Sequence, residues 1–202
     1  DIYASNAWGS DDSRSGTGSD LTQTESIRGM LPGLIKELGV NRMLDVPCGD
    51  FHWMRMLELD VDYIGADVVP ELIDAHNSEF SDNRRNFQVV NVAEDDLPQV
   101  DLIFCRDLLV HFSFIDALSA VENLKRSGSI YLLTTTFSDR ESNVDIDTGQ
   151  WRPINLMLPP FNFPSPMRLI NEKCTEFGSD WADKCLGLWL LGDLHVGGIP
   201  TE

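Results

Sequence analysis

Short apolar runs alternate with amphipathic segments along most of the chain. Runs typical of buried strands lie at residues 42–48, 62–68, 87–92, 100–106 and 129–137. Helical patterns lie at residues 21–38, 51–59, 70–80 and 112–126. Two final strand-like runs, residues 167–173 and 185–191, are joined by a turn and fit an antiparallel pair. Strands of near-continuous apolar character that alternate with helices favour a mostly parallel sheet covered on both faces.

Composition limits the partners. The chain has 202 residues with no internal repeat and no second core, so we expect one domain spanning residues 1–202. Its 33 acidic residues exceed its 15 basic ones, giving a net charge of −18. This charge repels nucleic acids and anionic membranes and favours a small-molecule partner. No apolar run reaches the ~18 residues of a membrane span.

The four cysteines show no metal-ligand spacing. Cys48, Cys105, Cys174 and Cys185 lack a CxxC pair and lie mostly in apolar surroundings. We therefore expect buried free thiols in a reducing compartment, which predicts a cytoplasmic location, and no metal site.

Acids and a glycine follow the first two strands. The segment DVPCGD places Asp45 inside the first strand, and Gly49 and Asp50 just beyond it. In an open parallel sheet ligands bind at such carboxyl ends, and a glycine lets the backbone pass close to them. Asp67 ends the next strand, where a carboxylate can accept two hydroxyl donors from a ribose. The alternatives are a buried acid for Asp45, a turn glycine for Gly49 and a helix cap for Asp67.

The ligand need not be a dinucleotide. Pyrophosphate recognition uses GxGxxG at the start of a helix, whereas here the three positions hold Pro47, Gly49 and His52. Asp50 would also place a negative charge beside the phosphates. S-adenosylmethionine has a ribose and an adenine but no phosphate, and its ammonium suits an aspartate. Asn91 and Val92, after the third strand, suit the edge and face of the adenine ring.

Residues 43–137 resemble the class I S-adenosylmethionine-dependent methyltransferases. The first motif of that family, an acid–x–Gly–x–Gly run, is matched at Asp45 and Gly49, and this chain departs from it at Pro47. The ribose acid corresponds to Asp67. The segment FCRDLLVHF, which contains Arg106, Asp107 and His111, resembles the motif after the fourth strand of the family.

The resemblance implies a fold and a division of the chain. The fold is a three-layer α/β/α sandwich with a doubly wound, mostly parallel seven-stranded sheet of order 3-2-1-4-5-7-6, whose last strand is antiparallel. Residues 1–40 would form an N-terminal lid segment and helix, and residues 41–137 the cofactor-binding core. Residues 138–202 would form the substrate-side loop and the terminal strand pair.

The resemblance also implies the site and the activity. The activity is methyl transfer from S-adenosylmethionine to a small acceptor, which we expect to be a sugar or phenolic hydroxyl, with S-adenosylhomocysteine as product. His111 and Asp107 are the candidate catalytic residues. The candidate cofactor-binding residues are Asp45, Pro47, Gly49, Asp50, Asp67, Val68, Asn91, Val92, Arg106 and Arg14.

Other interpretations stay open. His111 is either a general base or a cap of the following helix. Residues 9–20, with Arg14 and the flanking Tyr3 and Trp8, form either a lid over the cofactor or a flexible linker. The aromatic residues of segment 151–166 form either a packed cover or a substrate wall. A nicotinamide-dependent oxidoreductase and a non-catalytic binding module are the alternative functions.

Overall fold

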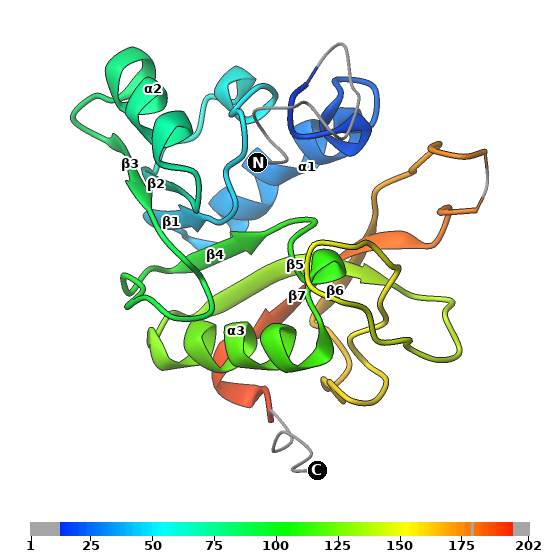
Figure 1. Ribbon diagram of the computed structural model, residues 1–202. Helices are drawn as coiled ribbons and strands as arrows, with labels where there is room; N and C mark the ends of the chain where they lie inside the picture. Colours follow the sequence, from blue (N-terminus) through cyan, green and yellow to red (C-terminus); the bar gives the residue numbers. More distant parts are fainter. Residues whose placement is uncertain (1–12, 179, 196–202) are drawn as a thin grey trace.

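Seven strands form one sheet through the middle of the molecule (Figure 1). In the computed structural model, which describes residues 13–178 and 180–195, these are β1 (Arg42–Asp45), β2 (Asp62–Asp67), β3 (Arg85–Val89), β4 (Leu102–Cys105), β5 (Tyr131–Phe137), β6 (Arg168–Asn171) and β7 (Lys184–Leu190). Their order is β3-β2-β1-β4-β5-β7-β6. The first five strands pair in parallel, and β7 is antiparallel to β5 and to β6. The predicted topology, with its antiparallel last strand, is confirmed.

Helices cover both faces of the sheet and make three layers (Figure 1). Helices α1 (Glu25–Leu38) and α2 (Pro70–Phe80) lie on one face, and α3 (Phe114–Arg126) lies on the other. Successive strand residues point to opposite faces. Met43 therefore belongs to the core cluster that contains the buried side of α1, and Leu44 to the cluster that contains α3. This explains why the strands read as continuous apolar runs.

The helix predicted at residues 51–59 is wrong. A 3₁₀ turn at Met54–Met56 is the only helical structure there. Gly49 and Phe51 have φ angles of +52° and +57°, which a right-handed helix cannot contain. The buried Phe51 ring packs 5.1 Å from the ring centre of Phe87 and 5.4 Å from that of Phe80, so tertiary contacts outweigh the local helical pattern.

Other boundaries differ by a few residues. The N-terminal helix begins at Glu25 and not at residue 21, and β1 ends at Asp45 and not at residue 48. Helix α3 begins after Ser113, whose hydroxyl accepts a hydrogen bond from the Asp116 amide. His111 therefore does not cap α3, and that interpretation is wrong.

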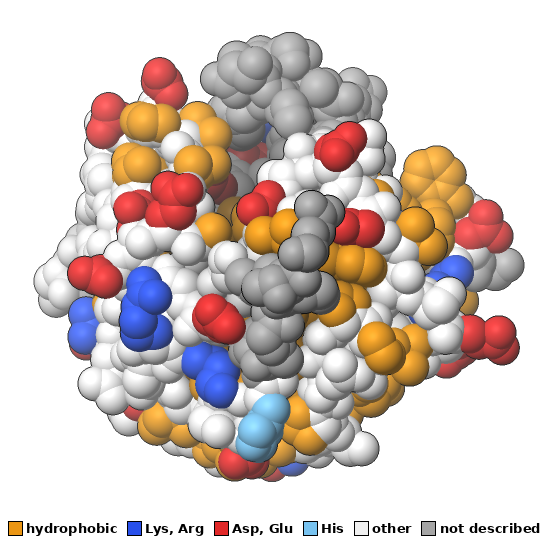
Figure 2. All heavy atoms as spheres, turned by 60° about the horizontal axis from the view of Figure 1, so that its bottom comes forward, with side chains coloured by type: hydrophobic (Ala, Val, Ile, Leu, Met, Phe, Trp, Pro, Cys, Tyr) orange, Lys and Arg blue, Asp and Glu red, His pale blue; other side chains and the backbone are white. Residues whose placement is uncertain are grey.

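The described surface carries more acid than base. On the face in Figure 2, basic side chains stand apart and form no large patch. No helix in residues 13–178 and 180–195 is long and apolar enough to cross a membrane. Over the same residues, no cluster of three or more His, Cys, Asp or Glu side chains could hold a metal ion.

Candidate active site

A cavity of about 990 Å³ opens at the carboxyl ends of the central strands. Asp45, Asp67 and Phe137, the last residues of β1, β2 and β5, line it. Its volume lies at the upper end of the ~300–1,000 Å³ typical of small-molecule sites. The cavity sits beside β1, where the strand order reverses, which is where open α/β sheets bind ligands.

Asp67 connects the ends of the first two strands. One carboxylate oxygen accepts a hydrogen bond from the Gly49 amide and the other from the Val69 amide, both at 3.2 Å. Burial raises the pKa of Asp67, against these two hydrogen bonds. A carboxylate has about four acceptor positions, so it keeps acceptor capacity for a ligand. The N-cap residue of α2 is Val69, so Asp67 is not the N-cap of that helix.

Asp45 is buried beneath the same loop. Its carboxyl group accepts a hydrogen bond from the Tyr63 hydroxyl. Burial raises the pKa of Asp45 to about 7, against the effect of this hydrogen bond. Asp45 therefore has a side-chain partner and also lines the cavity, which combines the two roles considered for it.

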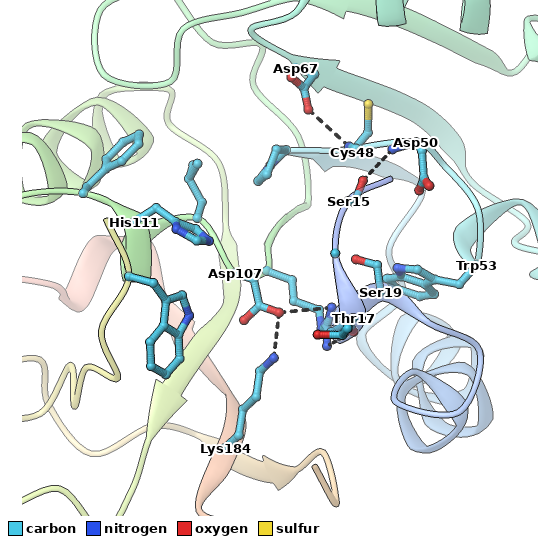
Figure 3. Close-up of a pocket in the computed structure, with 18 of the residues that line it drawn as sticks. Ser15, Thr17, Ser19, Cys48, Asp50, Trp53, Asp67, Asp107, His111 and Lys184 are labelled. Carbon is cyan, nitrogen blue, oxygen red and sulfur yellow. Dashed lines mark hydrogen bonds and ion pairs between the residues drawn. The ribbon is translucent and has the colours of Figure 1, made fainter. Parts of the chain in front are cut away.

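Asp50 holds the N-terminal segment over the cavity. Its Oδ2 accepts hydrogen bonds from the Ser13 hydroxyl and the Arg14 amide, both at 2.8 Å, and its own amide donates to Ser15 Oγ at 2.9 Å. Figure 3 shows Ser15 lying against the loop that carries Cys48 and Asp50. Residues 15–19 line the cavity, so the described part of the proposed lid is docked and does not run as a linker. Tyr3 and Trp8 lie outside the described residues.

Gly49 permits this docking. A Cβ atom at Gly49 would lie 2.3 Å from Ser15 Oγ, and its φ of +52° is one that residues with a side chain rarely adopt. Glycine is required here for two physical reasons, the backbone conformation and the approach of the N-terminal segment.

Three buried charged side chains and the half-buried Asp107 meet at the end of β4; we call these four residues the charge cluster (Arg106, Asp107, Glu172 and Lys184). Arg106 donates to Glu172 at 2.8 Å and to the Gly18 carbonyl at 2.8 Å, and Lys184 donates to Asp107 at 2.7 Å. Burial would raise the pKa of Asp107, but Arg106 and Lys184 outweigh it and hold that pKa well below its usual range. Asp107 is therefore ionised and cannot act as an acid near neutral pH.

His111 faces Asp107 across the cavity (Figure 3). Its Nδ1 lies 2.9 Å from the Gln150 carbonyl, which can only accept, so Nδ1 carries the proton and Nε2 is basic in the neutral ring. Burial lowers the pKa of His111 below its ordinary value. His111 is thus neutral at pH 7, the state that a general base needs.

Segment 151–166 divides between the two roles considered for it. Phe161 and Phe163 are buried in the core cluster that contains α3, which makes that part a packed cover. Trp151 is 41% exposed and lines the cavity, which makes it part of the wall. His195, at the end of the described chain, is exposed and does not line the cavity.

Most predicted site residues line one cavity. They are Asp45, Pro47, Gly49, Asp50, Asp67, Val68, Arg106, Asp107 and His111. Arg14 is exposed and does not line it; its amide, by contrast, helps to hold the lid. Asn91 and Val92 do not line it either: the Asn91 side chain accepts from the Ala93 amide, and the Val92 carbonyl accepts from Asn123. Cofactor binding by these three residues, as by the nine that line the cavity, stays a prediction.

The sequence reasoning missed several lining residues. Trp53, Leu72, Glu176, Trp181 and Lys184 are among them. Lys184 gave one usable signal, since it is a charged residue at the start of the apolar run KCLGLWL. Leu72 lies on α2, a helix that the sequence predicted, whereas Trp53, Glu176 and Trp181 lie in turns whose conformation depends on tertiary contacts.

Comparisons with known proteins agree on the fold. No protein-family model matches this sequence, and no curated protein matches it significantly. Among solved structures, N-methyltransferase NodS from Bradyrhizobium japonicum, in complex with S-adenosyl-L-homocysteine, matches with a TM-score of 0.65 at 15% identity, over 94% of this chain and 97% of that one.

Two further structures extend this likeness. Human N-acetylserotonin methyltransferase in complex with S-adenosylmethionine matches with a TM-score of 0.55 at 12% identity, over 93% of this chain and 64% of that one. A Nostoc punctiforme protein assigned as an O-methyltransferase matches with a TM-score of 0.59 at 13% identity, over 83% and 56%. This chain thus spans less than two thirds of these two. It has the fold of the class I S-adenosylmethionine-dependent methyltransferases.

The contact between Gly49 and Ser15 gives the first prediction. Gly49→Ala should free the N-terminal segment, because the new methyl group overlaps Ser15 Oγ. We expect amide hydrogen exchange to become at least tenfold faster in residues 13–19. The backbone strain should also lower the free energy of unfolding by about 1–2 kcal/mol.

Gly39→Ala is the matched control. Gly39 has a φ of +66°, and a Cβ atom added to it would meet no other atom within 4 Å, so this variant carries the same kind of strain without the overlap. Equal exchange rates at residues 13–19 in both variants would contradict the docking role of Gly49.

Proposed function

We propose that this protein transfers a methyl group from S-adenosylmethionine to a hydroxyl group of a small molecule. The observation that carries the proposal is the position of Asp67. Its buried carboxylate lies at the end of β2, lines the cavity and keeps acceptor positions beyond those used by Gly49 and Val69. A ribose diol fits such a group.

Other residues that line the cavity also support S-adenosylmethionine as the cofactor. Val68 follows Asp67, is 62% exposed and lines the cavity, so it offers an apolar face to an adenine ring. Asp45 and Asp50 place carboxyl groups on the β1 side of the cavity, which suits the ammonium and sulfonium charges of S-adenosylmethionine. When bound, S-adenosylmethionine supplies a methyl group on a positively charged sulfur atom.

The side chains of the protein position the acceptor and receive its proton. Two backbone contacts fix His111 beside segment 148–151: its carbonyl accepts from the Gly149 amide at 2.8 Å, and its Nδ1 donates to Gln150. His111 Nε2 is the atom that takes the hydroxyl proton. Holding the acceptor in line accounts for most of the rate enhancement, and a general base adds a typical ~10²–10⁴-fold.

The two alternative functions receive less support. A dinucleotide pyrophosphate needs a helix N-terminus after β1, and that position holds a turn with Asp50 in it. A module that had lost catalysis would be favoured by a collapsed pocket, and this cavity is open. We also propose a cytoplasmic location, because the four cysteines are buried and free.

Calorimetry tests the cofactor assignment. We expect S-adenosylhomocysteine to bind with a micromolar dissociation constant, and NAD to bind at least a hundredfold more weakly. Equal or tighter binding of NAD would overturn the methyltransferase proposal in favour of the oxidoreductase.

Asp67 provides the second prediction. Asp67→Ala removes two charge-assisted hydrogen bonds to the ribose, each worth about 1.5–3 kcal/mol. The affinity for S-adenosylhomocysteine should fall at least tenfold by calorimetry. Asp67→Asn keeps the shape and one acceptor oxygen and should lose less. Thermal unfolding shows whether both variants are folded, and unchanged affinity in folded Asp67→Ala would remove the ribose assignment.

The N-terminal segment provides the third prediction. If it closes over the cofactor, S-adenosylhomocysteine should slow amide exchange in residues 13–20. Asp50→Ala should speed that exchange in the cofactor-free protein, because the Ser13 hydroxyl and the Arg14 amide lose their acceptor. Arg14→Ala keeps the amide and tests the side chain separately through cofactor affinity. Exchange rates that respond to neither cofactor nor Asp50→Ala would contradict a lid.

His111 provides the fourth prediction. His111→Gln should lower turnover by ~10²-fold or more while changing cofactor affinity by only a few-fold. Because burial lowers the pKa of His111, its neutral form persists below pH 6.5, the ordinary value. The acid limb of kcat/KM should therefore lie below pH 6.5 and disappear in the variant. Full activity of His111→Gln would show that His111 is structural.

A further inference from the structure

Four aromatic side chains form one wall of the cavity; we call Phe137, Trp151, Phe177 and Trp181 the aromatic wall. The ring centres of Trp151 and Trp181 are 4.7 Å apart, and Phe137 lies 6.1 Å from the first and 6.0 Å from the second. Phe177 lies 6.4 Å from Trp181. All four pairs meet edge to face, so the rings pack as one unit.

This wall is held in place but left open to the cavity. Arg140 lies over the rings of Phe137 and Trp181, at 5.7 and 5.3 Å, and its guanidinium is paired with Asp183. Trp151 is nevertheless 41% exposed and Phe177 78% exposed. Large aromatic side chains fixed in position and exposed in a cavity favour stacking of a planar ligand.

The charges beside the wall select against anions. Among the described residues that line the cavity, the arginine is Arg106 and the lysine is Lys184. Both are paired with the carboxylates of the charge cluster. His111 is neutral at pH 7 because burial lowers its pKa. A ligand carboxylate or phosphate would therefore meet no uncompensated cation among these residues.

A carboxylate, by contrast, lies beside the wall. Asp180 lines the cavity, is exposed, and is one residue from Trp181. Its carbonyl accepts a hydrogen bond at 2.7 Å from Arg140, the same side chain that lies over Trp181. One arginine therefore fixes both the ring and the backbone of the acid. An ammonium group here would gain from the Asp180 carboxylate.

We propose that the acceptor is a phenol that stacks on the aromatic wall and carries an ammonium group directed to Asp180. The lining is mostly apolar here, so it cannot satisfy the many hydroxyl groups of a sugar. This inference rests on the proposed function and names its substrate class. The phenol proton goes to His111 Nε2, an O–CH₃ bond forms as the S–CH₃ bond breaks, and the bonding pair stays on sulfur, which leaves S-adenosylhomocysteine.

Four probes test the proposal by calorimetry on protein saturated with S-adenosylhomocysteine. Tyramine, 4-ethylphenol and 4-hydroxyphenylacetate share one ring and differ in charge, and glucose represents a sugar. We expect tyramine to bind at least tenfold more tightly than 4-hydroxyphenylacetate, with 4-ethylphenol between them. Glucose should show no binding.

Variants separate the ring from the charge. Trp151→Leu should weaken tyramine and 4-ethylphenol at least tenfold, and Phe177→Leu should weaken both by a smaller factor without risk to the fold, since Phe177 is 78% exposed. Asp180→Asn should reduce the preference for tyramine over 4-hydroxyphenylacetate to threefold or less and leave 4-ethylphenol unchanged. Ile115→Ala and Asp96→Asn, which do not line the cavity, are the controls.

The outcomes distinguish the two proposals. If S-adenosylhomocysteine binds but the phenols bind no better than glucose, or bind equally to Trp151→Leu and Phe177→Leu, the phenol proposal is overturned and methyl transfer stands. A preference for 4-hydroxyphenylacetate would overturn the ammonium assignment. If S-adenosylhomocysteine does not bind, the proposed function fails; tyramine binding to the cofactor-free protein that depends on Trp151 would then still support a phenol site, and its absence would overturn it.

Discussion

The arrangement of the site depends on the charge cluster at the end of β4. Arg106, Lys184 and Glu172 are buried together there beside the half-buried Asp107, and a buried charge is costly to leave unpaired in a low-dielectric interior. The four side chains come from the end of β4, from just after β6 and from the start of β7, and Arg106 also binds the Gly18 carbonyl. Compensation of charge therefore holds the centre of the sheet, its antiparallel edge and the N-terminal segment in one geometry. Thr135 of β5 joins them, because its hydroxyl accepts from the Asp107 amide at 2.9 Å.

The balance of charge within the cluster determines which charged groups remain in the cavity. Since Arg106 and Lys184 are balanced within the cluster, the remaining charged lining groups are acids at both ends: Asp45, Asp50 and Asp67 on the side of β1 and β2, and Glu176 and Asp180 on the other. Burial raises the pKa of Asp45 to about 7, so that carboxyl group can bind a cation or remain neutral. A ligand that carries positive charge along its length matches this distribution better than any phosphate-containing cofactor.

The sequence predicts features that depend on residues close together in the chain, and it does not predict contacts between distant residues. The spacing of Asp45, Gly49 and Asp67 predicted a shared site, because the carboxyl ends of parallel strands lie at one edge of the sheet. The strand order was predicted from a family resemblance. The turn after β1 could not be predicted from the sequence, because Phe51 packs against Phe80 and Phe87 although the local pattern is helical. Arg106 and Asp107 stood out in the sequence, but their partners lie 66 and 77 residues away, and no pattern pairs them.

The acceptor side of the cavity is built outside the regular sheet. His111 lies in a 3₁₀ turn, and Trp151 and Trp181 lie outside the strands and helices. A few tertiary contacts hold these segments: the Gln150 carbonyl binds His111, Arg140 lies over Trp181, and Arg152 donates to the Leu109 carbonyl. Such contacts can be replaced without disturbing the strand ladders that place Asp45 and Asp67. One fold can therefore carry sites of different chemistry. The acceptor that we propose follows from the chemistry of these loops, which in this chain is aromatic and acidic.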